Sequence, residues 1–358
     1  MQTSDISLGK MVIGNYAMTN KKFLSCKWLE HGIIFDHENI IRVCCSQCNE
    51  GGGRPVLRGQ FYGGSLDWGG IFAQKREMRQ FQRRGEVYPS CKGCVLLNED
   101  EWDDEDYIGM LLLTHWIDCN CRCIYCPAVS DEDLKKRNKH YNIVPVLQDL
   151  CDKKLLKKDA YISIAGGEST IYPEFEDMLH LLLDYGCNNI LINSSGIKYS
   201  PAIAKGLEER KLQLTVSVDS GCRETYEKMK LVPTYEKVCE NLTKYGIAQG
   251  EDPNRVCSKF IIVPGYNDNE KEIDMWLHNT KLQGLKHVSI DVDWRWVQKN
   301  LKRLKREKKI YDLIVHTSET AEKENLIIRY DERAAIMRRT YRKPFLSFSD
   351  FIKKIFKG

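Results

Sequence analysis

Six strand-like stretches, each followed by a helix-like stretch, constrain the fold of this chain more than any other feature of its sequence. The strand-like stretches are short apolar runs that end in small or polar residues, and the helix-like stretches are longer and polar, with spaced apolar residues. The expected strands lie within residues 106–117, 160–167, 188–196, 212–221, 257–265 and 286–294. The expected helices lie within residues 130–154, 173–186, 200–211, 234–250, 269–284 and 297–315.

This alternation predicts an α/β fold with a parallel sheet and its helices outside, because parallel neighbouring strands need right-handed crossover connections. We expect a partial (β/α)6 barrel of the TIM type over residues 108–298. Residues 1–107 are expected to form a small cysteine-rich, metal-binding lobe, and residues 299–358 a helical extension. In barrels of this kind the functional side chains lie at the carboxyl ends of the strands. The unusual residues of this chain follow its expected strands, as that rule requires.

Composition and charge narrow the classes of protein. The chain has 358 residues, of which 42% are hydrophobic and 29% charged, which is typical of a protein with a buried core. A formal net charge of +4 is too small to indicate a nucleic-acid surface, so we expect no nucleic-acid partner. The first 22 residues have no apolar signal segment, and no stretch approaches the roughly 20 apolar residues that span a bilayer. We expect a cytoplasmic protein, in which fifteen cysteines indicate metal or redox chemistry rather than disulfides.

Four cysteines lie close together after the first expected strand: Cys119, Cys121, Cys123 and Cys126. The spacing of the first, third and fourth is C-x3-C-x2-C. A cubane iron–sulfur cluster is normally held by four thiolates, so three would leave one iron open for a small molecule. The alternative is a zinc knuckle, because C-x2-C pairs are common in zinc sites. The cysteines alone do not decide between these two metals.

Motifs after the later strands favour the cluster. "GGE" follows the second strand at residues 166–168, and "SVDS" ends the fourth at residues 217–220. Together with the tyrosine before the third cysteine, these motifs stand in an order that resembles the radical S-adenosylmethionine (radical SAM) superfamily over residues 108–296.

The resemblance implies a [4Fe–4S] cluster on Cys119, Cys123 and Cys126, with S-adenosylmethionine chelating its fourth iron. Cys121 would then be surplus and is expected to point away from the cluster. In the superfamily the glycines of such a turn allow close backbone approach, the glutamate accepts from the methionine amino group, and strand-end serines and aspartate touch the methionine carboxylate or the ribose. Positions near the adenine are the tyrosine and the segment after the fifth strand. The matching residues here are Gly166, Gly167, Glu168, Ser194, Ser195, Ser217, Asp219, Tyr125 and Val263.

Asp291 and Asp293 lie at the end of the sixth expected strand, on the same face because side chains alternate along a strand. With Trp294 and Trp296 they are candidate substrate-facing residues, and two carboxylates there would bind a cation or act as general bases. The alternative is an ordinary solvated strand end.

The N-terminal segment holds a second group of cysteines. Two short strands are expected around the turn at residues 36–39, followed by a glycine-rich stretch and a helix within residues 73–86. The cysteine pattern resembles the auxiliary-cluster modules of the superfamily, called SPASM or twitch domains, although those modules usually follow the barrel. The ligands of a second [4Fe–4S] cluster would be Cys26, Cys44 or Cys45, Cys91 and Cys94, and a structural zinc is the alternative.

Two charged segments flank the expected barrel. The acidic run at residues 99–106 is expected to be an exposed linker, because like charges repel one another. Residues 343–358 predict a basic amphipathic helix, for which we favour docking on the barrel over contact with a membrane or a partner.

The function that follows is reductive cleavage of S-adenosylmethionine to a 5′-deoxyadenosyl radical, which abstracts hydrogen from the substrate. No winged-helix peptide-recognition segment is readable in residues 1–107, which favours a small-molecule or sugar-type substrate over a ribosomally made peptide. A one-electron reductant such as flavodoxin or ferredoxin is the expected partner. The alternative class is a non-catalytic iron–sulfur or electron-transfer protein, for which a methionine-binding strand end has no use.

Overall fold

A computed structural model of the chain describes residues 22–44, 56–57, 66–94, 96–126, 140–293, 295, 304–331, 333–335 and 338. Cys45, Trp294, Trp296 and the C-terminal segment 343–358 lie outside these residues. Within the described ranges, no helix has both the length and the apolar content needed to cross a bilayer.

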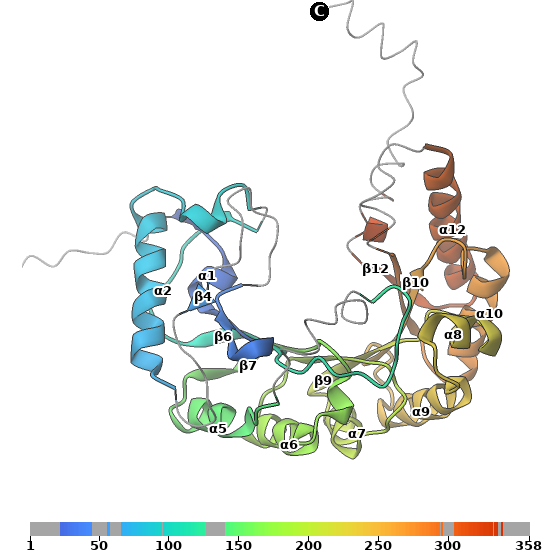
Figure 1. Cartoon of the computed structure of the whole chain (residues 1–358), viewed down its shortest axis with the longest axis horizontal. Helices are drawn as coiled ribbons and strands as arrows, with labels where there is room; N and C mark the ends of the chain where they lie inside the picture. Colours follow the sequence, from blue (N-terminus) through green and yellow to red (C-terminus); the bar gives the residue numbers. More distant parts are fainter. Residues whose placement is uncertain are drawn as a thin grey trace, which may run out of the picture.

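The described strands form one large curved sheet and a small two-stranded one. The large sheet has the order β12-β11-β10-β9-β8-β7-β6-β2-β3-β4 (Figure 1). Its six central strands are the predicted ones and are parallel: β6 (Ile108–Thr114), β7 (Leu156–Ile164), β8 (Ile190–Ser194), β9 (Leu212–Ser217), β10 (Val256–Ile262) and β11 (His287–Val292). The partial barrel predicted from the sequence is confirmed.

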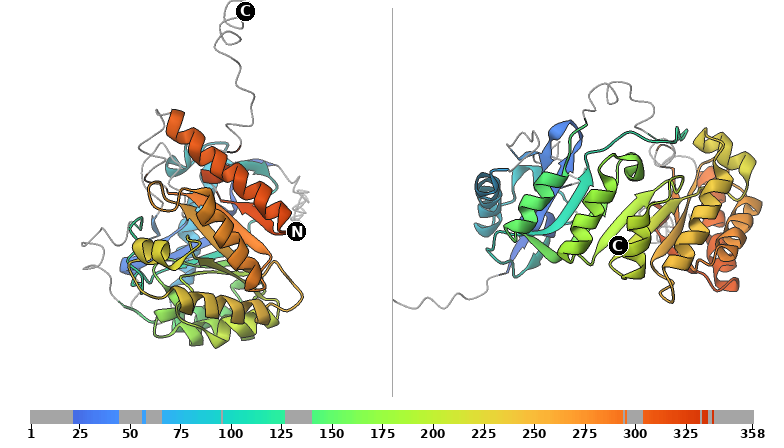
Figure 2. Two further views of the ribbon diagram at one scale, coloured as in Figure 1. Left: turned by 90° about the vertical axis from the view of Figure 1, so that its right-hand side faces the viewer. Right: turned by 90° about the horizontal axis from the view of Figure 1, so that it is seen from below.

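Helices cover the convex face of this sheet (Figure 1), and the right-hand view of Figure 2 shows them from below. They are α5 (Val144–Asp152), α6 (Phe175–Tyr185), α7 (Pro201–Glu208), α8 (Arg223–Lys230), α9 (Tyr235–Ala248), α10 (Glu270–Leu282) and α12 (Leu304–Lys323). Capping residues determine where these helices begin and end. Ser200 accepts from the Ile203 amide at 3.1 Å and caps α7, and Gly186 ends α6 in the left-handed region at φ 100°.

Strands that the repeat does not predict extend the sheet at both edges. β12 (Ile327–Tyr330) runs parallel to β11. At the other edge β2 (Gly32–Asp36) runs parallel to β6, and the hairpin predicted around residues 36–39 continues it through β3 (Ile41–Arg42) and β4 (Val56–Leu57). All five residues of β2 are buried, which is typical of a strand covered on both faces. The N-terminal segment therefore shares the sheet of the barrel, and the division at residue 107 stays a prediction about domains.

The described residues of the N-terminal part also form two helices, α1 (Lys27–His31) and α2 (Trp68–Arg83). The small sheet pairs β1 (Phe23–Ser25) with β5 (Asn98–Asp100) in antiparallel register. Short 3-10 helices lie at His37–Asn39, Pro89–Cys91 and Ser169–Ile171.

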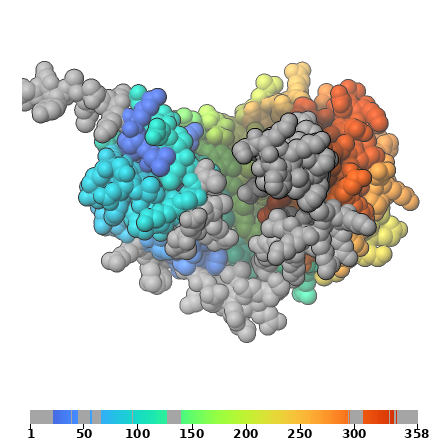
Figure 3. All heavy atoms as spheres, turned by 90° about the horizontal axis from the view of Figure 1, so that it is seen from above, coloured from blue at the N-terminus to red at the C-terminus, as the bar shows by residue number. Residues whose placement is uncertain are grey.

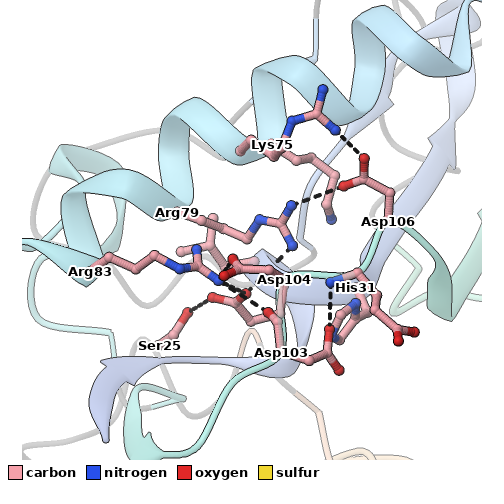
Figure 4. Close-up of polar contacts among 12 residues, drawn as sticks. Ser25, His31, Lys75, Arg79, Arg83, Asp103, Asp104 and Asp106 are labelled. Atoms are coloured by element: carbon pink, nitrogen blue, oxygen red, sulfur yellow. Dashed lines mark hydrogen bonds and ion pairs between the residues drawn. The ribbon is translucent and has the colours of Figure 1, made fainter. Parts of the chain in front are cut away.

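The acidic run at residues 99–106 is tied to α2 rather than being only an exposed linker (Figure 4). Asp106 accepts from Arg79 at 3.0 Å, and Arg83 pairs with Asp104. The Arg79 side chain is only 1% exposed, and a buried guanidinium requires anionic partners. Six of the eight residues of the run are exposed, as predicted, and the arginines of α2 offset the repulsion within it.

Candidate active site

The cysteine loop, residues 115–126, follows the carboxyl end of β6. Cys119 is exposed, and Cys123 and Cys126 are half-buried. The loop is held from one side by the end of α8: the amides of Arg122 and Ile124 donate to the carbonyls of Lys230 and Met229, each at 3.0 Å. Figure 3 shows the molecule from above, with the N-terminal part in blue and cyan on the left and the C-terminal part in orange and red on the right.

The glycine turn after β7 packs directly against the cysteine loop. A Cβ atom on Gly166 would lie 2.5 Å from the Trp116 carbonyl oxygen, and one on Gly167 would lie 2.2 Å from that of Asp118. Gly166 also has φ 119°, which favours glycine. The amides of Gly167 and Glu168 donate to the same two carbonyls at 2.9 and 2.8 Å. In this structure the close approach that the glycines allow is between these two loops.

The Glu168 carboxylate accepts hydrogen bonds from donors at the ends of β7 and β8. The residue is 1% exposed. Its Oε1 accepts from the Ser194 hydroxyl at 2.8 Å and from the hydroxyl and amide of Thr170, while its Oε2 accepts from the Ser195 amide. The Ser195 hydroxyl in turn donates to Asn120 of the cysteine loop at 3.1 Å. The predicted residues Glu168, Ser194 and Ser195 are thus brought together beside the cysteines.

Cys121 lies among the predicted ligands and does not point away from them. Its side chain is buried, and its thiol is hydrogen-bonded to Cys119 and Cys123. These bonds raise the pKa of Cys121. The same bonds lower the pKa of Cys119, and that of Cys123 to about 6, the latter with help from the Lys230 ammonium. The two predicted ligands thus favour the thiolate, the form that binds iron.

Asp219 is bonded inside the protein. The residue is fully buried, and its backbone has φ 59°. Its Oδ1 accepts a hydrogen bond from the Ile261 amide at 2.7 Å. Its Oδ2 accepts from the Lys230 ammonium at 2.5 Å and from the Tyr125 hydroxyl. Lys230 also donates to the Tyr125 oxygen at 2.7 Å. In this structure the carboxylate oxygens of Asp219 are thus bonded within the protein, and contact of Asp219 with the methionine carboxylate or ribose stays a prediction.

Two further predicted cofactor residues lie at neighbouring strand ends. Ser217 is half-buried at the end of β9, and Val263 is 2% exposed just after β10. The Val263 amide donates to Asn267 at 2.6 Å, which fixes the turn on which it lies.

Asp291 and Asp293 are each paired with an arginine. Asp291 is bonded to Arg333 at 2.7 Å, and burial raises its pKa. Asp293 is bonded to both Nε and Nη2 of Arg295, whose Nη1 donates to the Ile124 carbonyl of the cysteine loop at 2.6 Å. The end of β11 therefore contacts the cysteine loop, and contact of these carboxylates with a substrate stays a prediction.

The described N-terminal thiols are Cys26, Cys44, Cys91 and Cys94. Cys26 begins α1, where its sulfur accepts from the Leu29 amide at 3.4 Å. Burial raises the pKa of Cys91 to about 12, and the charges of the other three thiols add to that rise. The four thiols therefore lie within electrostatic reach of one another.

Among the described residues, no three His, Cys, Asp or Glu side chains are arranged to hold a single metal ion. A cubane cluster instead spreads its thiolates over four irons. The chemistry of the cysteine loop fits such a cluster: three thiols on one turn, two of them with a lowered pKa, and a buried ammonium beside them.

Comparison with known proteins agrees with this site. The family model described as the radical SAM superfamily matches residues 113–277, which include the cysteine loop and the glycine turn. This stretch, less than half of the chain, is thus similar to a radical SAM domain. No curated protein matches the chain in a sequence comparison.

Solved structures are similar to this chain at low identity. Streptococcus suis SuiB bound to its precursor peptide SuiA aligns with a TM-score of 0.50 and 11% identity, over 78% of this chain and 66% of that one. SuiB bound to S-adenosylmethionine aligns with a TM-score of 0.49 and 11% identity, over 69% and 55%. Native anSMEcpe with bound AdoMet aligns with a TM-score of 0.47 and 16% identity, over 62% and 63%. This chain thus spans 55–66% of the length of these neighbours.

Sequence reasoning missed the polar residues that hold the predicted ones in place. They are Asn120, Thr170, Lys230, Arg295 and Arg333. Asn120 stands inside the cysteine motif, but an asparagine in a loop has many ordinary roles. Lys230 lies at the end of a helix, where lysine is common, so its burial gives no signal in the sequence.

Proposed function

We propose that this protein is a radical SAM enzyme that cleaves S-adenosylmethionine reductively and uses the resulting 5′-deoxyadenosyl radical to abstract hydrogen from a substrate. The observation that carries the proposal is the packing of the glycine turn onto the cysteine loop, which joins the two motifs of the superfamily in one site. Cys119, Cys123 and Cys126 would hold a [4Fe–4S] cluster. When bound, the cluster supplies the electron for the cleavage and an open iron that binds the methionine end.

The chain's own groups orient that cofactor. Glu168 is fixed by Ser194, Ser195 and Thr170, and its Oε2 has a single bond among the described residues, so one lone pair can accept from the methionine amino group. The half-buried Ser217 offers a hydroxyl at the next strand end. Tyr125 and Val263 contribute through backbone and apolar contact near the adenine, since the Tyr125 hydroxyl is already bonded.

We also propose a second [4Fe–4S] cluster on Cys26, Cys91, Cys94 and either Cys44 or Cys45. A buried cation supports it: Lys75 is 2% exposed, and its ammonium donates to the carbonyl of Gly32 at 2.5 Å and to that of Trp28 at 3.3 Å.

Burial lowers the pKa of Lys75 to about 7, while the Glu30 carboxylate and the thiols of Cys26 and Cys44 oppose that shift. Negative charge at the thiols therefore stabilises the charged form of Lys75, and the Lys75 ammonium would in turn stabilise a cluster held by these thiols. An iron content near four per chain instead of eight would contradict this second site.

The substrate would be a small molecule of the hydroxylated or sugar type. The end of β11, at the edge of the cysteine loop, carries the two carboxylates Asp291 and Asp293 with their arginine partners, and such groups suit a polar substrate. Electrons would come from a cellular one-electron reductant such as flavodoxin or ferredoxin in the cytoplasm.

The second candidate is modification of a peptide by the same radical chemistry. Its support is the fold shared with SuiB, which was solved with its precursor peptide bound.

Hydrogen transfer from labelled extracts tests the proposal and separates the two substrates. The reconstituted enzyme is incubated anaerobically with S-adenosylmethionine, reductant and an extract of cells grown in deuterium oxide. The radical reaction places deuterium in 5′-deoxyadenosine, which mass spectrometry detects. The extract is treated with protease or passed through a small-molecule filter before the reaction. Labelled 5′-deoxyadenosine that still forms after both treatments supports the first substrate class. Labelling that is lost when the extract is treated with protease supports the peptide. No label with any fraction, in the presence of an intact cluster, contradicts hydrogen abstraction.

A further inference from the structure

A buried ion pair lies directly behind the cysteine loop. The side chains of Lys230 and Asp219 are 2% and 0% exposed, and their charged atoms are 2.5 Å apart. The Tyr125 hydroxyl bonds to both of them, and the lysine ammonium lies 5.3 Å from the centre of the tyrosine ring.

Lys230 contacts the loop on both sides of Cys123. Its backbone carbonyl accepts from the Arg122 amide at 3.0 Å, and its ammonium bonds to the hydroxyl of Tyr125, the residue before Cys126. Asp219 connects this contact to the barrel, because its other oxygen accepts from the Ile261 amide of β10. A buried helix end and a buried strand end thus fix the position of the loop.

The charges of the pair cancel close to the thiols. A lone ammonium at this depth would stabilise a more negative cluster, and a lone carboxylate would destabilise it, because burial strengthens both interactions. The chain therefore controls the charge near the loop through two residues that do not bind iron.

We propose that Lys230 and Asp219 are positioning residues, a charge-balanced pair that holds the cysteine loop and sets the reduction potential of the cluster bound there. The proposal deepens the function proposed above and rests on it. It differs from a purely mechanical role in one respect: removal of either charge must shift the potential, and the two shifts must have opposite signs.

The test is a redox titration of the SAM-binding cluster, followed by electron paramagnetic resonance, with the iron content of each variant measured in parallel. Lys230→Met leaves the carboxylate and is expected to lower the potential. Asp219→Asn leaves the ammonium and is expected to raise it. Each shift should reach at least threefold in the one-electron equilibrium constant, about 30 mV at 59 mV per tenfold. The double variant and Lys230→Arg should lie within threefold of wild type.

Lys228→Met is the matched control, because this lysine is exposed on the same helix, and its potential should equal that of wild type. If a single variant loses its cluster, recovery of wild-type iron in the double variant supports charge balance. Shifts of the same sign, no shift with the cluster intact, or iron loss in the double variant equal to that in the singles would overturn the proposal. A wild-type chain that holds no cluster would instead refute the proposed function, so the two failures are distinguishable.

Discussion

Replacement of His115 by phenylalanine should remove one pH-dependent part of the stability of this protein. His115 is the first residue of the cysteine loop, directly after β6, and is 5% exposed. Its ring lies 4.9 Å from that of Tyr172 and 5.4 Å from that of Tyr141. Neither ring nitrogen has a hydrogen-bond partner among the described residues. An uncharged aromatic ring of similar shape should therefore fit the same space.

The size of the effect follows from proton linkage. Burial, with a smaller contribution from His140, lowers the pKa of His115 from 6.5 to about 3. The unfolded chain therefore binds a proton at a higher pH than the folded chain. The neutral histidine contributes its full stability above the unfolded pKa and loses it as the pH falls toward the folded one. Between pH 7.5 and pH 5.5 this single group should lower the free energy of unfolding by about 1.4 kcal/mol.

The assay is urea unfolding of the anaerobically prepared protein at pH 7.5 and pH 5.5. The loss of stability between the two pH values should be about 1.4 kcal/mol smaller in His115→Phe than in wild type. His278→Gln is the matched control, because that histidine is exposed on α10 and its change should leave the pH dependence as it is. An equal pH dependence in His115→Phe and wild type would refute the reasoning, because it would mean that the buried ring does not resist protonation.

Three further predictions concern packing and charge around the site. Gly167→Ala should lower the iron content at the cysteine loop while the fold is kept, since its Cβ would lie 2.2 Å from the Asp118 oxygen. The control is Gly69→Ala, whose Cβ would make only a 3.5 Å contact. Full iron content in both variants would count against the packing argument. Glu168→Gln should lower the free energy of unfolding in urea by about 1–3 kcal/mol, because an amide nitrogen cannot accept hydrogen bonds from the donors bonded to the carboxylate. It should also weaken S-adenosylmethionine binding in equilibrium dialysis. Unchanged affinity would show that this residue is not part of the cofactor site. Arg79→Met should destabilise the protein by about 3–5 kcal/mol in urea unfolding, because it removes the buried cation that pairs with the Glu30 carboxylate at 3.7 Å and leaves the more exposed Arg83 at 3.9 Å. The half-exposed Arg76→Met should have a much smaller effect, and equal losses would mean that burial of the pair is unimportant.

The sequence predicted the barrel because each of its strands is a local pattern. The run at residues 108–114 is apolar and β-like, and the helix after each strand repeats its buried positions every three or four residues. The attachment of β2 was not predictable in this way. "GIIFD" reads as a buried strand, but nothing in it specifies a partner that begins 76 residues later in the chain, at Ile108.

The same distinction between local patterns and contacts of distant segments applies to the residues of the site. Its motif residues are recognisable because cluster chemistry and close backbone contact restrict them to cysteine and glycine at fixed spacings. The residues that hold them, such as Lys230 and Asn120, are chosen by contacts between distant segments. Cys121 illustrates the limit most simply: its position in the motif gave no information about the direction of its thiol, which bonds to the thiols on both sides.

Formation of 5′-deoxyadenosine is the measurement that tests the central claim most directly. The anaerobically reconstituted protein is mixed with S-adenosylmethionine and dithionite, and the products are quantified by liquid chromatography and mass spectrometry. The account predicts 5′-deoxyadenosine and methionine from the wild type and from Cys239→Ala, whose thiol lies on α9. It predicts neither product from the triple alanine variant of Cys119, Cys123 and Cys126. Continued product formation by the triple variant, or none by a wild type with its full iron content, would contradict it.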